Sequence, residues 1–519
     1  MGIAIGIDLG TTNSAIAVVR PDGRPEILKN REGAATTPSV VLFQDFGGGD
    51  EPLVGEQAKR QAGINPTDVV QHVKRYMGDA SWRFDSESGA QYSPEEVSAI
   101  VLKRLKEDAE LALGASVTDA VITVPAYFDD SRRIATKHAG QIAGLNVLRV
   151  LNEPTAAALS YGVENNSGGH VLVYDLGGGT FDVTILRIAG AEFEVVATDG
   201  DRNLGGFDFD NALMNYLNDE LKKQGAPDSF EDVSLMVQLR EQAEDVKKSL
   251  STVPATNAYV TIHGRSYRVP VNRGIFDAQI AGLLRRTEEI LEDVLQEAQL
   301  TWAHIDKVLL VGGSTRMPAV RQMLEKVTGK TPELGVNPDE AVALGAAIQA
   351  ALESEPEEET IGFIGGRTAV EGLLGGPVRV KDVTSQALGA ILFKYNTDEK
   401  INRIIIPRNS EVPAKHNREV YTRYNYQESI LVTVTQGDDE DPEFVTIVGK
   451  GVLDMPIKYP KGAPLEYIYK YDVDQIINVE VIDVTANISL GTFQIDRVAN
   501  LTQEQIEKAN YKIGSMMIM

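Results

Sequence analysis

The sequence predicts an α/β region with a duplicated core, followed by an antiparallel β region. "DLGTTNSA" begins at Asp8 and "DLGGGTFD" begins at Asp175, and each stands between a short apolar run and a β-prone run. The same aspartate-tipped hairpin is therefore expected twice. Strand and helix patterns alternate as far as residue 352, whereas short strands separated by turns dominate from Val378 onward.

Composition indicates a globular protein that is not expected to bind polyanions. A chain of 519 residues suggests about three or four compact units, and 43% hydrophobic with 24% charged residues is ordinary for a packed core. The net charge of −25 would repel nucleic acid and anionic lipid, so neither is expected as a partner. The chain contains no cysteine, which excludes disulfides and cysteine-based metal sites.

The N-terminal stretch and the hydropathy pattern bear on location. "MGIAIGIDLG" has no basic segment before its apolar residues, so no signal peptide is expected. No apolar run approaches the length of a membrane-spanning helix. We therefore expect a cytoplasmic protein.

Apolar periodicity and the residues that begin or end helices and strands predict the elements of the first region. Apolar residues at helical spacing, acidic starts and glycine stops indicate helices, and short apolar runs that end at glycine or proline indicate strands. The expected elements are a hairpin over 3–19, helices over 95–113, 129–144, 152–162, 235–250 and 275–299, a strand over 119–128, strand–turn–helix over 171–221, strands within 257–271, strand–turn–helix from 306, and an Ala-rich helix over 337–352.

Composition changes after residue 352. The run "ESEPEEE" and the glycine-rich stretch after it predict an insertion and linker over 353–381. Repeated short strands then predict an antiparallel β domain over 382–500. In the last segment, 501–519, Thr502 with Gln505 three residues later predicts a capped helix start.

The two hairpin turns are suited to binding phosphate. Glycines permit positive φ and let backbone N–H groups approach an anion, while Thr11, Thr12 and Thr180 add hydroxyl donors. Two such turns that face each other would clamp nucleotide phosphates, and Asp8 and Asp175 would hold Mg²⁺ directly or through water. The alternative is two ordinary tight β-turns.

A third glycine turn, in "VGGSTRMP", ends a strand and opens a helix. Gly312 and Gly313 there suit an adenosine or its α-phosphate. "GKT" at 329–331 is not a P-loop, because Leu324 stands where the first glycine belongs. The Rossmann fingerprint is also missing.

Seven motifs in order resemble the nucleotide-binding domain of the 70-kDa heat-shock chaperones of the DnaK type. They are "IGIDLGTTNSAIAV", "VPAYFDDSRRIATKHAG", "VLNEPTAAALSYG", "VYDLGGGTFDVTIL", "NLGGFDFD", "VLLVGGSTRMPAV" and "VNPDEAVALGAAIQ", spread over about residues 2–352. The resemblance implies an actin-like (ribonuclease H-like) duplicated ATPase domain over 1–352, followed by a β-sandwich domain. It also implies ATP and ADP as ligands with Mg²⁺, and K⁺ as a further cation.

The resemblance implies roles for single residues. Asp8 and Asp175 would flank the Mg²⁺ shell, and Asp182 matches a carboxylate linked to monovalent cations. Lys74 would orient the attacking water, and Glu153 would lie near that water. Thr180 would contact the γ-phosphate. The other implied nucleotide contacts are Gly10, Thr11, Thr12, Asn13, Gly177, Gly178, Gly179, Gly205, Gly206, Glu244, Lys247, Lys248, Ser251, Gly312, Gly313, Ser314, Arg316 and Asp339.

Each implied role has an ordinary structural alternative. Lys74 fits a solvated surface charge, and Glu244 with Lys247 fits a surface ion pair on one helix. Pro125 and Arg133 match the pair that couples nucleotide state to the second domain in the family. Pro125 also fits a simple strand end, and Arg133 fits one more helix charge.

The stretch 382–500 resembles the peptide-binding domain of the same family. Ile430 and Val432 would face the peptide cleft with Val420 beneath, and Phe393 lies near an arch position. Alternatively these residues form a plain sandwich core.

Three departures from the family pattern concern the coupling of the domains. Arg379 and Lys381 stand where the family's linker has leucines, a glycine-rich insertion covers about 354–377, and only the first turns of a helical lid are expected in 501–519. In addition, Arg423 stands where a small arch residue would sit.

These observations lead to an expected function with alternatives. We expect an ATP-dependent molecular chaperone, a slow Mg²⁺-dependent ATPase that binds extended apolar segments of unfolded proteins. J-domain co-chaperones and nucleotide exchange factors are expected partners. The alternative is a nucleotide-binding regulator or scaffold with weak or uncoupled peptide binding. A small-molecule kinase of the same superfamily is disfavoured, because no sugar-binding insertion is visible.

Overall fold

Contacts between residues divide the chain, seen here in a computed structural model, into two units. The first comprises Met1–Ala126, Ala135–Arg379 and Thr502–Met519, and the second comprises Tyr127–Ile134 and Val380–Leu501. The structure describes residues 3–45, 47, 49–165, 168–333, 337–354, 365–394, 397–472, 476–494 and 500–519.

The first unit contains two sheets with the same arrangement of strands. In each, a hairpin supplies two antiparallel strands, and a later strand pairs parallel with the first hairpin strand. The expected repetition of the hairpin is therefore confirmed. One sheet has the order β11-β10-β1-β2-β3, from β1 (Ile3–Asp8), β2 (Asn13–Val19), β3 (Pro25–Leu28), β10 (Val117–Val124) and β11 (Asn146–Asn152), and the other contains β17-β12-β13-β14, from β12 (Gly169–Leu176), β13 (Phe181–Ala189), β14 (Glu192–Asp201) and β17 (Ile305–Val311).

Small residues let helices approach each other and the first sheet closely. A Cβ on Gly345 would collide with the backbone of Ala156, and a Cβ on Gly6 would collide with the backbone of Ala347. The Ala-rich helix α9 (Ala341–Glu353) therefore packs against α4 (Glu153–Asn165) and against β1. This contact holds the two ends of the predicted 1–352 region together.

The second half of the first unit has its own large core. Side chains of β12, β13 and β17 share it with helices on the sheet and with a separate hairpin. The elements are α5 (Gly206–Lys223), α6 (Val233–Thr252), β15 (Ala255–Ile262), β16 (Arg265–Asn272), α7 (Arg273–Glu297) and α8 (Pro318–Thr328).

The first half carries an additional small sheet and several helices. The long helix α2 starts where the sequence predicts it, because Ser93 and Glu96 form a capping box. The elements are β4 (Thr37–Pro38), β5 (Val40–Asp45), β6 (Asp50–Val54), α1 (Glu56–Gln61), β7 (Val69–Gln71), a 3₁₀ turn η1 (Val73–Tyr76), α2 (Pro94–Leu113) and α3 (Asp130–Ile142).

The second unit is built from two four-stranded antiparallel sheets that share one core. Val432 and Val434 from one sheet and Tyr469 and Val479 from the other are fully buried in it. The Tyr469 hydroxyl donates to the carbonyl of Gly389 at 3.0 Å and links the sheets. The orders are β20-β19-β23-β24 and β22-β25-β26-β27, from β19 (Leu388–Phe393), β20 (Lys400–Ile406), β22 (Ala414–Tyr421), β23 (Gln427–Gln436), β24 (Thr446–Tyr459), β25 (Pro464–Tyr471), β26 (Ile477–Asp483) and β27 (Ile488–Gln494).

The stretch between the predicted domains is only partly described. Residues 355–364 of the expected insertion lie outside the described residues. The remainder contains a helix, α10 (Arg367–Leu374), and the expected linker forms β18 (Arg379–Val383), which pairs with β21 (Glu411–Val412).

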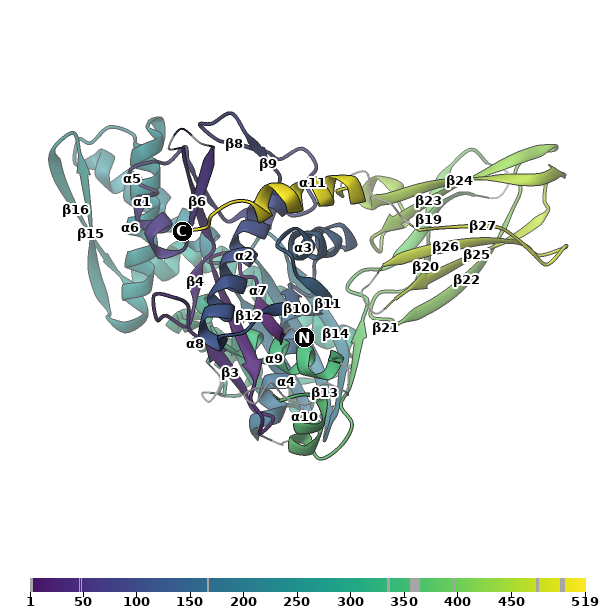
Figure 1. Cartoon of the computed structure of the whole chain (residues 1–519), viewed down its shortest axis with the longest axis horizontal. Coiled ribbons are helices and arrows are strands. Elements are labelled where there is room, and N and C mark those ends of the chain that lie inside the picture. Colours follow the sequence, from purple (N-terminus) through teal and green to yellow (C-terminus); the bar gives the residue numbers. More distant parts are fainter. Residues whose placement is uncertain are drawn as a thin grey trace. The chain divides into compact units, whose positions relative to one another are not determined.

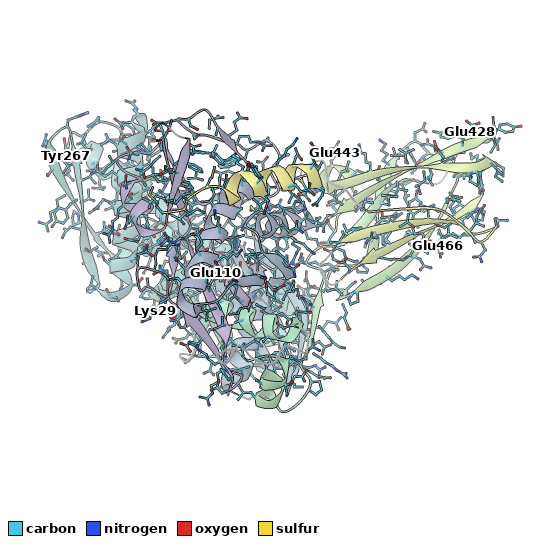
Figure 2. All side chains as sticks on the ribbon, in the orientation of Figure 1. Lys29, Glu110, Tyr267, Glu428, Glu443 and Glu466 are labelled. Atoms are coloured by element: carbon cyan, nitrogen blue, oxygen red, sulfur yellow. The ribbon has the colours of Figure 1, made fainter. Side chains whose placement is uncertain are left out.

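Acidic side chains stand on the strands of the second unit. Figure 2 labels Glu428 on β23 and Glu466 on β25. Glu428 is exposed and forms an ion pair with Lys458 at 2.7 Å.

Within the described part of the chain, no helix combines the length and the apolar character needed to cross a membrane.

The C-terminal segment belongs to the first unit. Thr502 caps helix α11 (Gln503–Gly514) and forms a capping box with Gln505, as predicted. Lys103 of α2 donates to the carbonyls of Ile513 and Gly514 at 3.0 and 3.1 Å. Figure 1 shows the chain end beside β6 and α1, and Met519 exchanges backbone hydrogen bonds with that strand. The residues expected as the start of a lid are thus bonded to the first unit.

This docking predicts unequal effects of two neighbouring substitutions in α11. Ile513 is 0% exposed, whereas Tyr511 is 82% exposed. Ile513→Ala should destabilise the first unit by about 2–5 kcal/mol, because it leaves a cavity under the helix. Tyr511→Ala should change stability by no more than about 0.5 kcal/mol. Differential scanning calorimetry measures both, and equal unfolding temperatures for the two variants would contradict the docked helix.

Candidate nucleotide site

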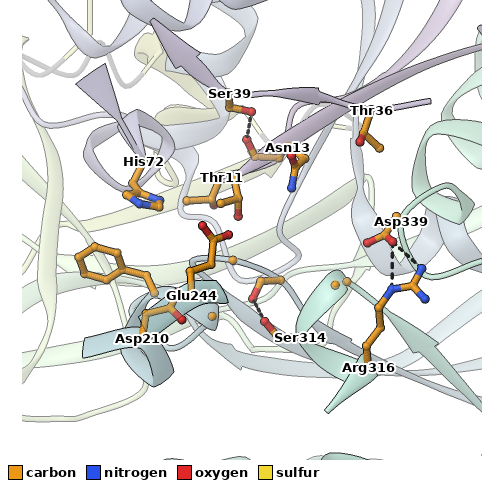
Figure 3. Close-up of a pocket in the computed structure, with 18 of the residues that line it drawn as sticks. Thr11, Asn13, Thr36, Ser39, His72, Asp210, Glu244, Ser314, Arg316 and Asp339 are labelled. Atoms are coloured by element: carbon orange, nitrogen blue, oxygen red, sulfur yellow. Dashed lines mark hydrogen bonds and ion pairs between the residues drawn. The ribbon is translucent and has the colours of Figure 1, made fainter. Parts of the chain in front are cut away.

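The repeated hairpin turns line one cavity in the first unit. The cavity has a volume of about 670 Å³, and both turns, α6 and the turn after β17 contribute to it. Figure 3 shows Thr11 and Asn13 of the first turn opposite Ser314 and Glu244, with Arg316 and Asp339 at one side. The two predicted phosphate turns therefore do converge.

The first turn is fixed from behind by Ser39. Its hydroxyl donates to the carbonyl of Gly10 at 2.8 Å, and its backbone N–H donates to the carbonyl of Thr12 at 2.9 Å. These bonds fix two carbonyls of the turn, and successive backbone N–H groups of such a turn can bind an anion. The first turn is therefore held in place by a residue of its own half of the unit.

The second turn is fixed by three sets of donors. The backbone N–H groups of Gly206 and Phe207 donate to the carbonyls of Gly177 and Gly178 at 2.9 and 2.8 Å. Ser314 adds a hydroxyl bond to the carbonyl of Gly177 at 2.9 Å. The third carbonyl of the turn, that of Gly179, accepts from Arg75 and is considered further below.

Glycine is required where the two turns approach each other. A Cβ on Gly178 would collide with the hydroxyl of Thr12. A Cβ on Gly179 would lie 2.6 Å from the methyl group of Thr11. The side-chain-free backbone of the second turn thus lets the two turns form the narrow end of the cavity.

Two buried carboxylates sit at this narrow end. Asp8 and Asp175 end β1 and β12, and both line the cavity. Burial and the nearby charge of Glu153 raise the pKa of Asp8 to about 7. Burial, with Glu153, Asp182 and Asp8 close by, raises the pKa of Asp175 well above its usual range. Such a cluster favours a bound cation, because a cation would relieve the repulsion between the ionised carboxylates.

Lys74 and Glu153 form a buried ion pair in the cavity. The Nζ atom of Lys74 lies 2.5 Å from the Oε1 atom of Glu153, and the two side chains are 5% and 10% exposed. Lys74 lies on η1, and Glu153 begins α4. A lysine held this firmly inside a cavity is not the solvated surface charge of the ordinary alternative.

The donor set suits Mg²⁺ that is bound mainly through phosphate and water. No group of three or more His, Cys or acidic side chains that could enclose a metal ion occurs among the described residues. Mg²⁺ in nucleotide sites is ordinarily held by one or two carboxylates together with phosphates and waters. Asp8 and Asp175 therefore fit the ion when a nucleotide supplies the remaining oxygens.

The far end of the cavity is lined by α6 and the third glycine turn. Lys247 lies 2.7 Å from Asp210, and its ammonium donates to the carbonyl of Gly206 at 3.0 Å. Burial raises the pKa of Glu244, but Lys59 at 2.8 Å and Lys248 at 2.7 Å outweigh it, and the pKa is lowered to about 2.

The third turn adds a further ion pair. The Nη2 atom of Arg316 lies 2.5 Å from the Oδ2 atom of Asp339. The turn thus presents charged side chains beside Gly313.

Nearly all residues predicted to contact the nucleotide line this cavity. The exceptions are Gly179, Gly205 and Asp182, which lie just behind it: Gly205 contacts the backbone of Gly179, and Asp182 is paired in register with Asp175. The predicted residues that line the cavity are Asp8, Gly10, Thr11, Thr12, Asn13, Lys74, Glu153, Asp175, Gly177, Gly178, Thr180, Gly206, Glu244, Lys247, Lys248, Ser251, Gly312, Gly313, Ser314, Arg316 and Asp339.

The two residues of the predicted coupling pair are assigned to different units. Pro125 follows β10 in the first unit, and Arg133 falls in the segment that clusters with the second unit. Arg133 is buried and its Nε atom donates to the carbonyl of Phe128 at 3.2 Å. Arg133 is therefore not the solvated helix charge of the alternative, while its coupling role stays a prediction.

Three of the four predicted peptide contacts are buried in the core of the second unit. Val420, Ile430 and Val432 are at most 7% exposed and belong to its hydrophobic cluster, as the alternative interpretation expects. Phe393 is 45% exposed. The guanidinium of Arg423 covers its ring at 3.6 Å from the centroid and also ion-pairs with Asp398.

Comparison with known families agrees with this geometry. A family model described as "Hsp70 protein" matches residues 4–517. The chain belongs to the Hsp70 family. Membership makes it, in general terms, an ATP-dependent chaperone with ATPase activity that binds ATP or ADP with Mg²⁺.

Sequence reasoning missed several residues that shape the cavity. Ser39, Lys59 and Asp210 hold the turns or charged residues of the site through the contacts given above. Phe207 and Arg240 also line it. Asp210 and Phe207 lie within the quoted motif "NLGGFDFD", which could have indicated them, whereas nothing near Ser39 or Lys59 in the sequence signals a role.

The packing of Gly205 behind the second turn gives a direct test of the site. A Cβ on Gly205 would lie 2.6 Å from the backbone N atom of Gly179, and its φ of −173° is open to any residue. Gly205→Ala should therefore displace the turn and weaken ADP binding about tenfold or more, which is about 1.4 kcal/mol.

Gly282 provides the matched control, because a Cβ there meets nothing within 4 Å and helix α7 favours alanine. Isothermal titration of ADP measures both variants. An unchanged ADP affinity in Gly205→Ala would contradict the placement of the nucleotide phosphates against the second turn.

Proposed function

We propose that the first unit is an actin-like ATPase that hydrolyses ATP between its two hairpin turns and so sets the affinity of the second unit for extended polypeptides. The observation that supports this most directly is the buried Lys74–Glu153 pair, 2.5 Å long, beside Asp8 and Asp175 in the same cavity. A cationic donor and a carboxylate at the meeting point of two phosphate turns suit the attack of water on a γ-phosphate.

Each residue has a distinct proposed task. Lys74 orients the attacking water and offsets charge that develops on the γ-phosphate. Glu153 holds Lys74 in place, and the Glu153 carboxylate also accepts a hydrogen bond from that water. Thr180 donates to the γ-phosphate from the second turn. Slow turnover is proposed, as the family resemblance implies.

Cations complete the proposed site. Mg²⁺, when bound, would offset the charge of the phosphates, and Asp8 and Asp175 would orient its waters. Asp182 lies beside Asp175 across the β12–β13 pair and is buried, so it is the proposed neighbour of K⁺. At the far end of the cavity, the α6 charges and the turn at Gly313 would hold the adenosine.

The first test removes the proposed water-orienting amine. Lys74→Ala should lower ATP turnover by at least about 100-fold while ATP affinity stays of the same order, because the adenosine and phosphate turns remain intact. Steady-state phosphate release and titration of a non-hydrolysable ATP analogue measure the two quantities.

Lys508→Ala is the matched control, because Lys508 also pairs with a glutamate but lies exposed on α11. Turnover that survives in Lys74→Ala at the rate of this control would exclude Lys74 from the chemistry.

The second unit is proposed as a β-sandwich that binds extended apolar segments of unfolded proteins. Such segments can be held by backbone hydrogen bonds and a few side-chain contacts. Phe393 is the exposed apolar candidate, and Arg423, stacked on its ring, would restrict access to it. Val420, Ile430 and Val432 would lie below, in the core. J-domain co-chaperones and nucleotide exchange factors are the proposed partners, and the cytoplasm is the proposed compartment.

The second test compares peptide binding in the two nucleotide states. An extended apolar peptide should bind at least about fivefold more weakly with ATP than with ADP, because nucleotide state shifts the conformation of the peptide-binding unit. Fluorescence anisotropy gives association and dissociation rates, and a polar peptide of equal length serves as the control.

A regulator or scaffold with uncoupled peptide binding is the second candidate. Two observations favour it: the expected linker carries charged Arg379 and Lys381, and Lys381 ion-pairs with Glu411 at 3.4 Å inside the second unit. Equal peptide affinities with ATP and with ADP would support this candidate over the coupled chaperone.

A further inference from the structure

The third carbonyl of the second phosphate turn is held by a residue from the other half of the first unit. The guanidinium of Arg75 donates to the carbonyl of Gly179 through Nη2 at 2.9 Å and through Nε at 3.2 Å. Arg75 lies on η1, next to Lys74, whereas the turn joins β12 and β13. The other two carbonyls of the turn are bonded within its own half, by Gly206, Phe207 and Ser314.

Arg75 is itself braced on two sides. It ion-pairs with Asp208. The carboxylate of Asp208 also accepts a hydrogen bond from the backbone N–H of Gly205 at 2.9 Å and so caps α5. Its guanidinium also lies 4.6 Å from the centroid of the Phe207 ring. Arg240 covers the same ring at 4.9 Å. Cations within about 6 Å of an aromatic ring are attracted to it, and planar guanidinium groups stack well.

We propose that Arg75 is a positioning residue that gives the second phosphate turn its preference for a triphosphate, with Phe207 as its support. The inference rests on the proposed function of the cavity. Gly179 directly precedes Thr180, the proposed γ-phosphate donor, so the carbonyl that Arg75 holds belongs to the γ-phosphate end of the turn. Gly177 and Gly178 stay fixed without Arg75, and contacts to the remaining phosphates therefore do not depend on it.

The arrangement also links the geometry of the turn to closure of the cavity. Arg75 reaches the turn only while the two halves of the first unit are close together, since its own backbone lies in the first half. Separation of the halves would remove both Arg75 bonds from Gly179 at once. The γ-phosphate end of the second turn is then ordered only in the closed cavity.

The test uses Arg75→Lys, which keeps the charge but loses the forked pair of donors. The ratio of affinities for a non-hydrolysable ATP analogue and for ADP should fall about tenfold, and single-turnover hydrolysis should slow about tenfold, while ADP affinity stays within about twofold. Phe207→Leu keeps an apolar side chain without the ring and should shift the ratio about threefold in the same direction. The double variant should be less than additive, because both changes act on one contact.

Arg265→Lys is the matched control, because Arg265 also covers an aromatic ring, that of Tyr267, at 4.8 Å. Figure 2 labels Tyr267 on the β15–β16 hairpin, Arg265 is exposed, and neither residue lines the cavity. This variant should leave both affinities and the hydrolysis rate unchanged.

The outcomes separate the inference from the proposed function. An unchanged affinity ratio and hydrolysis rate in both Arg75→Lys and Phe207→Leu would overturn the inference while ATP binding by the parent chain still stands. Equal losses of ATP and ADP affinity would also overturn it, since they would show a general structural role. Failure of the parent chain to bind ATP would instead refute the proposed function. Circular dichroism with ADP bound confirms that each variant is folded.

Discussion

The close approach of two glycine turns that carry buried carboxylates is the constraint on which the rest of the first unit depends. Burial raises the pKa of Asp8 and of Asp175, so the chain by itself holds these groups at an energetic disadvantage. A protein keeps such a cluster where a ligand compensates it, and a nucleotide with its metal ion brings the compensating charge. The bonds to Ser39, Gly206, Phe207, Ser314 and Arg75 share one role, because each fixes a backbone carbonyl of one of the two turns.

The two turns are not equivalent in how they are supported. The first is held by Ser39, from the same half of the unit. The second depends for its last carbonyl on Arg75, from the opposite half. A duplicated core thus carries an asymmetric site, and only one of its turns changes its support when the halves separate. The Lys59–Glu244 pair joins α1 to α6 and also spans the halves, so charge contacts as well as hydrogen bonds favour the closed form.

Much of this could be predicted from the sequence, for a physical reason. Repeated turn chemistry signals that two aspartates end equivalent strands, and equivalent strands in duplicated sheets place them together. Capping residues such as Ser93 and Thr502 fix helix starts through local bonds. Contacts that depend on distant packing could not be predicted, among them Ser39 on the first turn and Met519 on β6. Alternation in a strand also cannot separate a cleft from a core, which is why Val432 was open to both interpretations and is fully buried.

The placement of α11 ties the C-terminal segment of the chain to the first unit. The stretch Val380–Leu501 of the second unit continues into the first unit at both of its ends, near Arg379 and near Thr502. Lys103 and the backbone of β6 hold the second connection through hydrogen bonds to Gly514 and Met519. At the first connection, Arg379 and Lys381 are charged where the family's linker has leucines. The helices α2 and α11 are bonded to each other through Lys103, and both lie in the half of the first unit that carries Lys74 and Arg75.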